Sequence, residues 1–400
     1  MSESEAAAGT RGTATGATDA TGQSIAELLS EIVRIPSVNP MHQGPRSGTA
    51  AEADMADWLA ERATALGADV ELEVIQPGRP NVYARFAGRT ERMLAIDIHL
   101  DTVGVEHMEG EPFDGRVSEG RVWGRGAVDT KATMAVVLAV LGEMASAGQQ
   151  PACTVELVGT ISEEGGGLAG ATAYRDRLLT RGERREQIVV AEPTMCAPVY
   201  GHKGGLGIEV QIEGRAAHSS KPHLGINALS AGGRVVAAID AEQERLTSRG
   251  KAGALGAGTV SVNEMHGGRA RNIVPDLCEL YVGRRIADGE DYETEYSRLT
   301  EVIRAAALPA RVSVQMANGF GSNAFLQAPE CALVTSLAQL SGRSPEVADY
   351  GTNALRYGEV ADQIAVFGPG SIDQAHQAVE WVEISQLERA ADIYRKLLTR

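Results

Sequence analysis

Two hydrophobic periodicities alternate along the first half of the chain. Apolar residues spaced three and four apart predict helices that include residues 25–32 and 55–66, and Ser24 with Glu27 has the spacing of a capping box. Short runs rich in branched aliphatic residues predict strands, namely DVELEVI, NVYARFA, MLAIDI, TVELVGTI and QIVVA. Because these strands alternate with helices, the pattern predicts a layered α/β domain.

The pattern changes at about residue 198, where strands and helices follow in the order β-α-β-β-α-β. This order is typical of a ferredoxin-like unit, and one of its helices is expected over residues 227–239. We therefore predict a mixed-sheet, three-layer catalytic domain in two parts, residues 23–197 and 317–400. An inserted α+β domain spans residues 198–316, and the small, polar residues 1–22 are expected to form a disordered tail.

Composition excludes several classes of partner. The formal net charge of −16 argues against nucleic acid and against an anionic membrane surface, because both bind basic patches. No apolar run reaches the length of a transmembrane helix, and the first residues lack the apolar segment of a signal peptide. The four cysteines are far apart, which favours a reducing compartment over a disulfide framework. We therefore expect a cytoplasmic protein.

Acidic and histidine side chains follow three of the predicted strands, at the point where each strand ends. MLAIDI leads into His99 and Asp101, TVELVGTI into Glu163 and Glu164, and QIVVA into Glu192. Because ligands of open α/β sheets bind at the carboxyl ends of strands, these side chains are expected at one edge. Two further residues are expected at the same edge: Asp129, before a strongly apolar helix, and His376, after the run QIAVFGPG.

Imidazole and carboxylate groups are good ligands for zinc and similar divalent ions. Taken singly, each residue has an ordinary explanation, such as a helix cap for Asp129 or a solvated surface for the Glu163-Glu164 pair. Together they suit two ions that share a bridging carboxylate and bind an attacking water. Glu163 and Glu164 can divide the roles of general base and ligand, and Asp101 can orient the His99 imidazole.

A rival interpretation comes from Gly165–Gly170, which match G-x-G-x-x-G between a strand and a helix. With Glu192 about twenty residues later, this spacing is that of a Rossmann-type NAD-dependent oxidoreductase. Glu163 and Glu164 place negative charge where a pyrophosphate would bind, which argues against it. It also leaves His99, Asp129 and His376 without a role.

An ordered series of motifs resembles the di-zinc amidohydrolases and metallopeptidases that include acetylornithine deacetylase, succinyl-diaminopimelate desuccinylase, aminoacylase and the glutamate carboxypeptidases. The resemblance covers nearly everything after the tail. Its motifs are IHLDTV, GRGAVDTKATM, ISEEGGGLAGA, VVAEPT, GHKGGLGIEVQIEGRAAHSSKPHLGINAL, GGRARNIVPDLCEL and GPGSIDQAH. Within this group, YGTNA followed by GPGSIDQAHQAVEWVE is most similar to acetylornithine deacetylase.

The resemblance implies a role for each motif residue. It implies two divalent metal ions, zinc first with cobalt or manganese as alternatives, held by the following ligands: His99, Asp129 and Glu192 on one ion, and Glu164, Asp129 and His376 on the other. Glu163 would be the general base and Asp101 the residue that orients His99. His218 of the inserted domain would stabilise the oxyanion in a partner subunit, so the resemblance implies a homodimer paired through this lid domain. Asn272 and Arg285 would contact substrate, Arg285 through a carboxylate.

The substrate is the part of this interpretation with alternatives. The motifs favour a small, carboxylate-bearing N-acyl amino acid cleaved by an acetylornithine deacetylase-like enzyme. A dipeptidase, a carboxypeptidase or a succinyl-diaminopimelate desuccinylase would use the same ligands. Two departures fall near substrate contacts: Gly283 and Asn353 stand where relatives often carry acids.

His107 and His202 are interpreted as residues that do not bind metal. A catalytically dead binding homologue is disfavoured, because every expected ligand is present.

Overall fold

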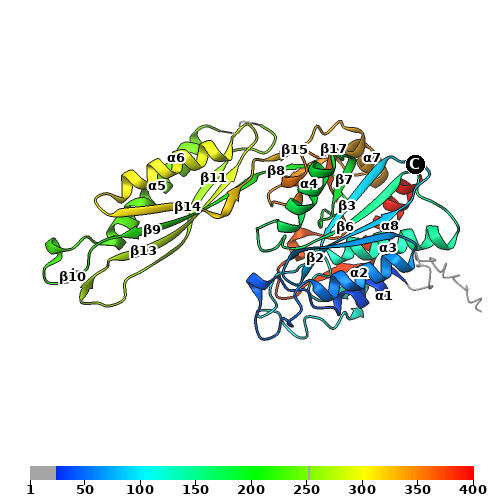
Figure 1. Cartoon of the computed structure of the whole chain (residues 1–400), viewed down its shortest axis with the longest axis horizontal. Helices are drawn as coiled ribbons and strands as arrows, with labels where there is room; N and C mark the ends of the chain where they lie inside the picture. The colour runs from blue at the N-terminus through cyan, green and yellow to red at the C-terminus, as the bar shows by residue number, and fades with distance from the viewer. Residues whose placement is uncertain (1–23, 251–252) are drawn as a thin grey trace, which may run out of the picture.

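The computed structural model describes residues 24–250 and 253–400, which form a large and a small lobe (Figure 1). The expected tail, residues 1–22, lies outside the described residues. The predicted capping box is confirmed: the Ser24 side chain accepts the Glu27 backbone N–H, and the Glu27 side chain accepts the Ser24 N–H. Among the described helices, none is both long and apolar enough to cross a bilayer.

The large lobe is built on a nine-stranded mixed sheet. Its order is β1-β2-β6-β3-β7-β17-β8-β15, with β16 paired to β8. The central neighbours β6, β3, β7 and β17 run parallel, whereas β1 and β2 are antiparallel additions at one edge. The strands are β1 (Asp69–Gln76), β2 (Arg79–Phe86), β3 (Met93–His99), β6 (Thr154–Thr160), β7 (Arg185–Val190), β8 (Val199–His202), β15 (Phe325–Leu326), β16 (Glu346–Ala348) and β17 (Ala361–Val366).

Helices cover both faces of this sheet, which confirms the predicted three layers (Figure 1). Side chains of β3 alternate between two cores: Leu94, Ile96 and Ile98 pack on one face, and Ala95 on the other. The first face carries α1 (Ile25–Val33), α2 (Ala53–Ala65), α3 (Lys131–Ser146), α7 (Ala332–Ser341) and α8 (Ile384–Thr399). The second face carries α4 (Ala169–Arg181). A separate small sheet joins β4 (Val117–Ser118), β5 (Arg121–Trp123) and β18 (Trp381–Glu383).

The small lobe is the predicted ferredoxin-like unit. Its sheet has the order β11-β13-β9-β14, and its two helices pack on one face through alternate residues such as Ile208, Val210 and Ile212. The elements are β9 (Gly204–Glu213), α5 (Ala228–Ser248), β11 (Thr259–Gly267), β13 (Leu277–Ile286), α6 (Tyr292–Ala307) and β14 (Arg311–Gly321). A two-stranded ribbon of β10 (Ala217–His218) and β12 (Ile273–Val274) lies at the tip farthest from the large lobe (Figure 1).

Two details of the small lobe differ from the sequence pattern. β8, which follows residue 198, pairs within the large sheet, so the small-lobe sheet starts with β9 at Gly204 and ends with β14 at Gly321. Helix α5 runs beyond residue 239 to Ser248, because Leu246 continues its buried face.

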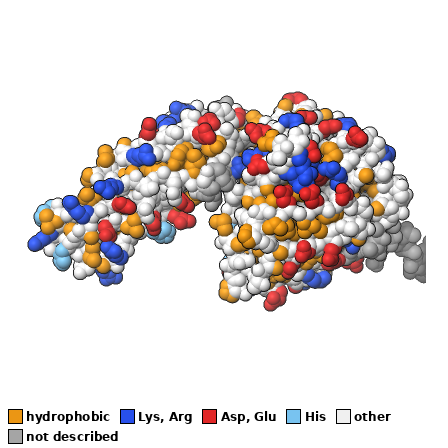
Figure 2. Space-filling model, in the orientation of Figure 1, with side chains coloured by type: hydrophobic (Ala, Val, Ile, Leu, Met, Phe, Trp, Pro, Cys, Tyr) orange, Lys and Arg blue, Asp and Glu red, His pale blue; other side chains and the backbone are white. Residues whose placement is uncertain are grey.

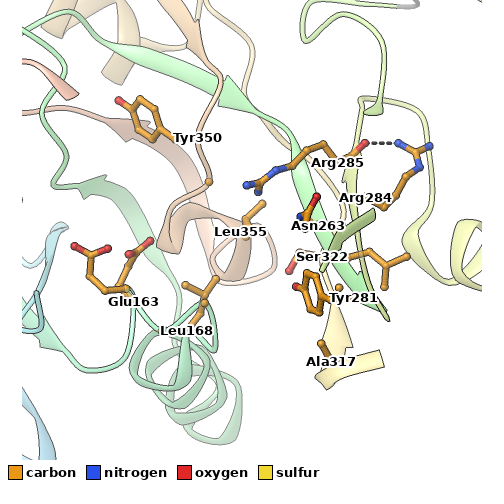
Figure 3. Close-up of a pocket in the computed structure, with 18 of the residues that line it drawn as sticks. Glu163, Leu168, Asn263, Tyr281, Arg284, Arg285, Ala317, Ser322, Tyr350 and Leu355 are labelled. Atoms are coloured by element: carbon orange, nitrogen blue, oxygen red, sulfur yellow. Dashed lines mark hydrogen bonds between the residues drawn. The ribbon is translucent and has the colours of Figure 1, made fainter. Parts of the chain in front are cut away.

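A cleft of about 770 Å³ lies between the two lobes. Its floor on the large lobe comes from the loop after β6, including Glu163 and Glu164, and from His376. Its other wall is the open face of the small-lobe sheet, which presents Tyr281 and Arg285 (Figure 3). The fold therefore places Glu163, Glu164 and His376 in a cleft between the two lobes.

Figure 2 shows how charged side chains are distributed over one face of the molecule. In the view of Figure 2, Lys and Arg side chains are interspersed with Asp and Glu side chains over both lobes. This mixed distribution agrees with the acidic net charge of the whole chain, −16.

Candidate metal centre

The parallel strands bring the predicted acids and histidines to one edge of the large sheet. His99 ends β3, Glu163 and Glu164 follow β6, Glu192 follows β7, and His376 lies on the loop after β17. Asp129 comes from the turn before α3. Since neighbouring parallel strands end at the same edge, residues far apart in the sequence meet there.

His99 is held with one ring nitrogen free to act as a ligand. Its Nδ1 lies 2.9 Å from the carbonyl oxygen of Asp101, an acceptor that requires the proton on Nδ1. Its Nε2 then faces Asp129, with 3.0 Å to Oδ1. This is the arrangement in which a neighbouring acceptor fixes the tautomer of a metal-binding histidine.

Two triplets of potential ligands share Asp129. The ligand atoms of His99, Asp129 and Glu192 lie within 4.8 Å of one another, and so do those of Asp129, Glu164 and His376. His376 Nε2 is 3.0 Å from Glu164 Oε2 and 3.4 Å from Asp129 Oδ2. The structure thus brings together all five residues that the sequence predicts as ligands, with Asp129 in the middle.

Asp101 makes different contacts from those expected. Its carboxylate Oδ1 is 3.7 Å from His99 Nδ1, so the hydrogen bond from the ring goes to the Asp101 carbonyl instead. The carboxylate accepts the backbone N–H groups of Glu163 (3.1 Å) and Glu164 (2.9 Å) and the side-chain amide of Asn39 (2.7 Å). It therefore fixes the loop that carries the predicted base and ligand.

Burial and the crowding of carboxylates shift the pKa values of the side chains in the centre. Burial, together with the neighbouring carboxylates, raises the pKa of Glu163 and Glu192 well above the ordinary value, and raises that of Glu164. For Asp129 burial acts in the same direction, but hydrogen bonds from His376 and His99 outweigh it and lower its pKa. Hydrogen bonds to Asp129 and Glu164 raise the pKa of His376 to about 10. The site as a whole stabilises positive charge.

The donor set fits a pair of divalent cations. Imidazole nitrogen and carboxylate oxygen suit zinc, and they also suit manganese and cobalt. Four carboxylates around two imidazoles leave an excess of negative charge that bound cations would neutralise. Ligation by these residues stays a prediction, which the shared triplets support.

Sequence reasoning missed several residues that support the centre. Asn39 binds the Asp101 carboxylate, and Glu52, fully buried and paired with Arg79, accepts the Ser162 N–H. Glu380 accepts the backbone N–H groups of Val128 and Asp129. Nothing in the local sequence of Asn39 or Glu52 identifies these residues, because each acts on groups of a distant segment. Arg125 and Glu380 do fall inside the motifs GRGAVDTKATM and GPGSIDQAHQAVEWVE.

The three predicted small-lobe residues fall into two places. Arg285 lines the cleft (Figure 3), and its guanidinium has no hydrogen-bond or ion-pair partner among the described residues. His218, on β10, and Asn272, just before β12, lie at the distant tip, where the Asn272 carbonyl accepts the Ser219 N–H. Both tip residues are exposed and far from this chain's own acids.

The residues interpreted as non-ligands lie outside both triplets. His202 is buried, with Nε2 2.9 Å from Thr352 Oγ1, and burial lowers its pKa to about 4. His107 Nε2 is 3.2 Å from the His376 carbonyl oxygen. Asn353 is buried and donates to Thr160 Oγ1 (3.0 Å).

A family comparison agrees with this chemistry. Residues 95–400 match the model of Peptidase family M20/M25/M40. An acetylornithine deacetylase of Myxococcus xanthus is 31% identical over 76% of this chain and 78% of its own length. A succinyl-diaminopimelate desuccinylase of Methylobacterium radiotolerans is 30% identical over 93% and 95%, and a probable carboxypeptidase of Aspergillus oryzae is 26% identical over 92% and 88%.

The fold has solved counterparts. A tripeptidase of Staphylococcus aureus superposes with a TM-score of 0.75 at 22% identity, over 96% of this chain and 98% of its own. The peptidase-family match overturns the oxidoreductase alternative. In the structure a carboxylate oxygen of Glu192 lies within 4.8 Å of ligand atoms of His99 and Asp129, and Glu163 and Glu164 line the cleft directly before the glycines.

The metal-free protein should lose stability as the pH rises. Glu163 and Glu192 have folded pKa values above 4.5, and His376 has one of about 10 against 6.5, so the folded state holds protons that the unfolded state releases. Their stabilisation is present at low pH and is lost as the pH rises through the folded values, for His376 between 6.5 and about 10. Thermal unfolding of chelator-treated protein at a series of pH values across this window measures the loss.

Zinc should remove most of that dependence and raise the Tm. A ligand at a thousand times its Kd stabilises the folded state by about 4 kcal/mol. A Tm that is independent of both pH and zinc would contradict the expected centre.

Proposed function

This chain belongs to Peptidase family M20/M25/M40, and on that premise we propose that it is a di-metal amidohydrolase of acetylornithine deacetylase type. It would hydrolyse the amide bond of a small N-acyl amino acid that carries a carboxylate. The observation that carries the proposal is the pair of ligand triplets sharing Asp129, next to the Glu163 carboxylate in the cleft. Zinc is the proposed metal, and the cytoplasm the proposed location.

Glu163 is the proposed general base. Its side chain lines the cleft, and its carboxylate accepts no hydrogen bond from the described residues, so it is free to take a proton from water (Figure 3). The N–H bond to Asp101 holds its backbone in place. Two bound divalent ions would supply Lewis acidity and lower the pKa of the attacking water. Glu163 would then pass the proton to the leaving amine.

Arg285 is the proposed anchor for the substrate carboxylate. Its unpartnered guanidinium faces the cleft from the wall opposite Glu163 (Figure 3). Guanidinium binds carboxylate through two parallel hydrogen bonds, which fixes orientation as well as charge. The substrate would span the cleft with its carboxylate on the small lobe and its amide at the acids.

A homodimer is proposed from the position of His218. The β10–β12 ribbon lies at the end of the small lobe remote from this chain's own acids (Figure 1). His218 would therefore act, with Asn272 nearby, in the cleft of a second copy, where its imidazole would stabilise the developing oxyanion.

A peptidase is the second candidate, favoured by the names of the carboxypeptidase and tripeptidase relatives. A release assay on N-acetyl, N-succinyl and dipeptide substrates, with metal-depleted and zinc-restored protein, decides between them. The proposal expects N-acetyl amino acids to be cleaved fastest, and only with metal. Faster cleavage of dipeptides would favour the peptidase, and equal rates without metal would refute both.

Glu163→Gln should lower kcat by about 10²–10⁴-fold with zinc still bound, because the amide cannot accept the proton. Glu359→Gln, an exposed change on the same lobe, is the control and should leave kcat unchanged. Full turnover by Glu163→Gln would show that another group is the base.

His218→Ala should be rescued by mixing with Glu163→Gln. Each mixed dimer would then contain one intact site, which restores at most about one quarter of the parent activity on statistical mixing. Activity of the subunit mixture measures this, with His266→Ala as the small-lobe control. Absence of rescue in dimers shown to have exchanged would argue that His218 does not act in trans.

A further inference from the structure

A buried ion pair lies behind the metal centre. Arg125 and Glu380 are 1% and 2% exposed and bind each other directly. Glu380 Oε1 also accepts the backbone N–H groups of Val128 (3.1 Å) and Asp129 (3.4 Å). Glu380 thus holds the backbone of the residue that the two ligand triplets share.

Arg125 extends the same network to two other loops. Its Nη2 donates to the carbonyl oxygens of Gly104 (3.1 Å) and Gln377 (3.3 Å). Gly104 lies on the loop after His99, and Gln377 directly follows His376. The pair therefore ties together three segments, each of which supplies a predicted ligand.

Both partners lie next to strands of the small β4-β5-β18 sheet: Arg125 follows β5, and Glu380 directly precedes β18. Trp123 of β5 pairs with Trp381 of β18, so Arg125 and Glu380 lie beside adjacent paired strands. The Arg121 guanidinium stacks 3.7 Å above the Trp381 ring. Strand pairing thus brings the segments of Arg125 and Glu380, which are far apart in the sequence, side by side.

Stability alone explains this pair poorly. Desolvation offsets most of the attraction within a buried ion pair, so its net contribution to folding is small. The chain contains a comparison: Arg185 and Glu156 are each 3% exposed and form a second buried pair, bonded to Tyr174. Among the described residues, the side chains of the Arg185–Glu156 pair make no hydrogen bond to the segments that carry the predicted ligands. The Arg125–Glu380 pair binds backbone groups on three such segments.

We infer that Arg125 and Glu380 are positioning residues that set the spacing between Asp129 and His376, and so the affinity for metal. The inference rests on the proposed function. Removing a supporting partner of a metal ligand typically weakens metal binding about 10–100-fold. The loss should be greatest for the ion held by His376, since the pair supports both Asp129 and the His376 loop.

Zinc affinity and stoichiometry of Glu380→Gln test this, measured by chelator competition and elemental analysis. We expect one of two zinc ions to bind about 10–100-fold more weakly, with activity recovered by excess zinc. Glu156→Gln is the matched control: it should lower the Tm but leave zinc affinity unchanged. Arg125→Lys keeps the charge but cannot reach all its acceptors, and should weaken zinc binding less than Glu380→Gln.

Parent-like zinc affinity in folded Glu380→Gln would overturn the inference, and so would an equal loss in Glu156→Gln. If Glu380→Gln does not fold, Arg125→Lys decides, and parent-like affinity there overturns it. Failure of the parent to bind zinc would instead refute the proposed function.

Discussion

The structure depends on a concentration of negative charge that the protein interior would not tolerate alone. Asp129, Glu163, Glu164 and Glu192 are gathered at one edge of a sheet. Isolated carboxylates in such a setting take up protons or move apart. Here Glu380 and Asp101 hold the backbone N–H groups of Asp129, Glu163 and Glu164 in place. Burial raises the pKa of three of the four carboxyl groups, and two imidazoles lie beside them. The arrangement favours a positively charged occupant, which is the physical basis for proposing metal.

The supporting network works mainly through backbone groups. Asp101 holds the N–H groups of Glu163 and Glu164, and Glu380 holds that of Asp129. Asp101 and Glu380 are themselves carboxylates, so they add negative charge near the centre. Arg125 offsets the charge of Glu380, and Arg79 that of Glu52. Ligand geometry and charge balance are thus supplied by different residues.

The sequence predicts where the proposed ligands lie better than it predicts the residues that support them. His99, Glu164 and Glu192 follow strong apolar strands, and strand direction alone brings such ends together. The position of Asp101 after a strand marks it as a candidate site residue. Its contacts cannot be predicted, because they depend on how the loop after β6 folds back. Asn39 and Glu380 bind segments far away in the chain, and no local periodicity encodes such a pairing. The start of the small-lobe sheet is equally hard to predict. The hydrophobic pattern of β8 would be the same whether this strand paired in the large sheet or in the small-lobe sheet.

The inserted lobe separates two tasks that a single domain would have to combine. Arg285 faces this chain's own cleft, while His218 sits at the opposite end of the same lobe. On the proposed function, one lobe would orient substrate in its own subunit and complete the oxyanion site of another. Neither site would then be complete in a monomer. Catalysis would depend on assembly as well as on metal, because a single chain would supply the charged sheet edge and the carboxylate anchor but not the group that stabilises the oxyanion.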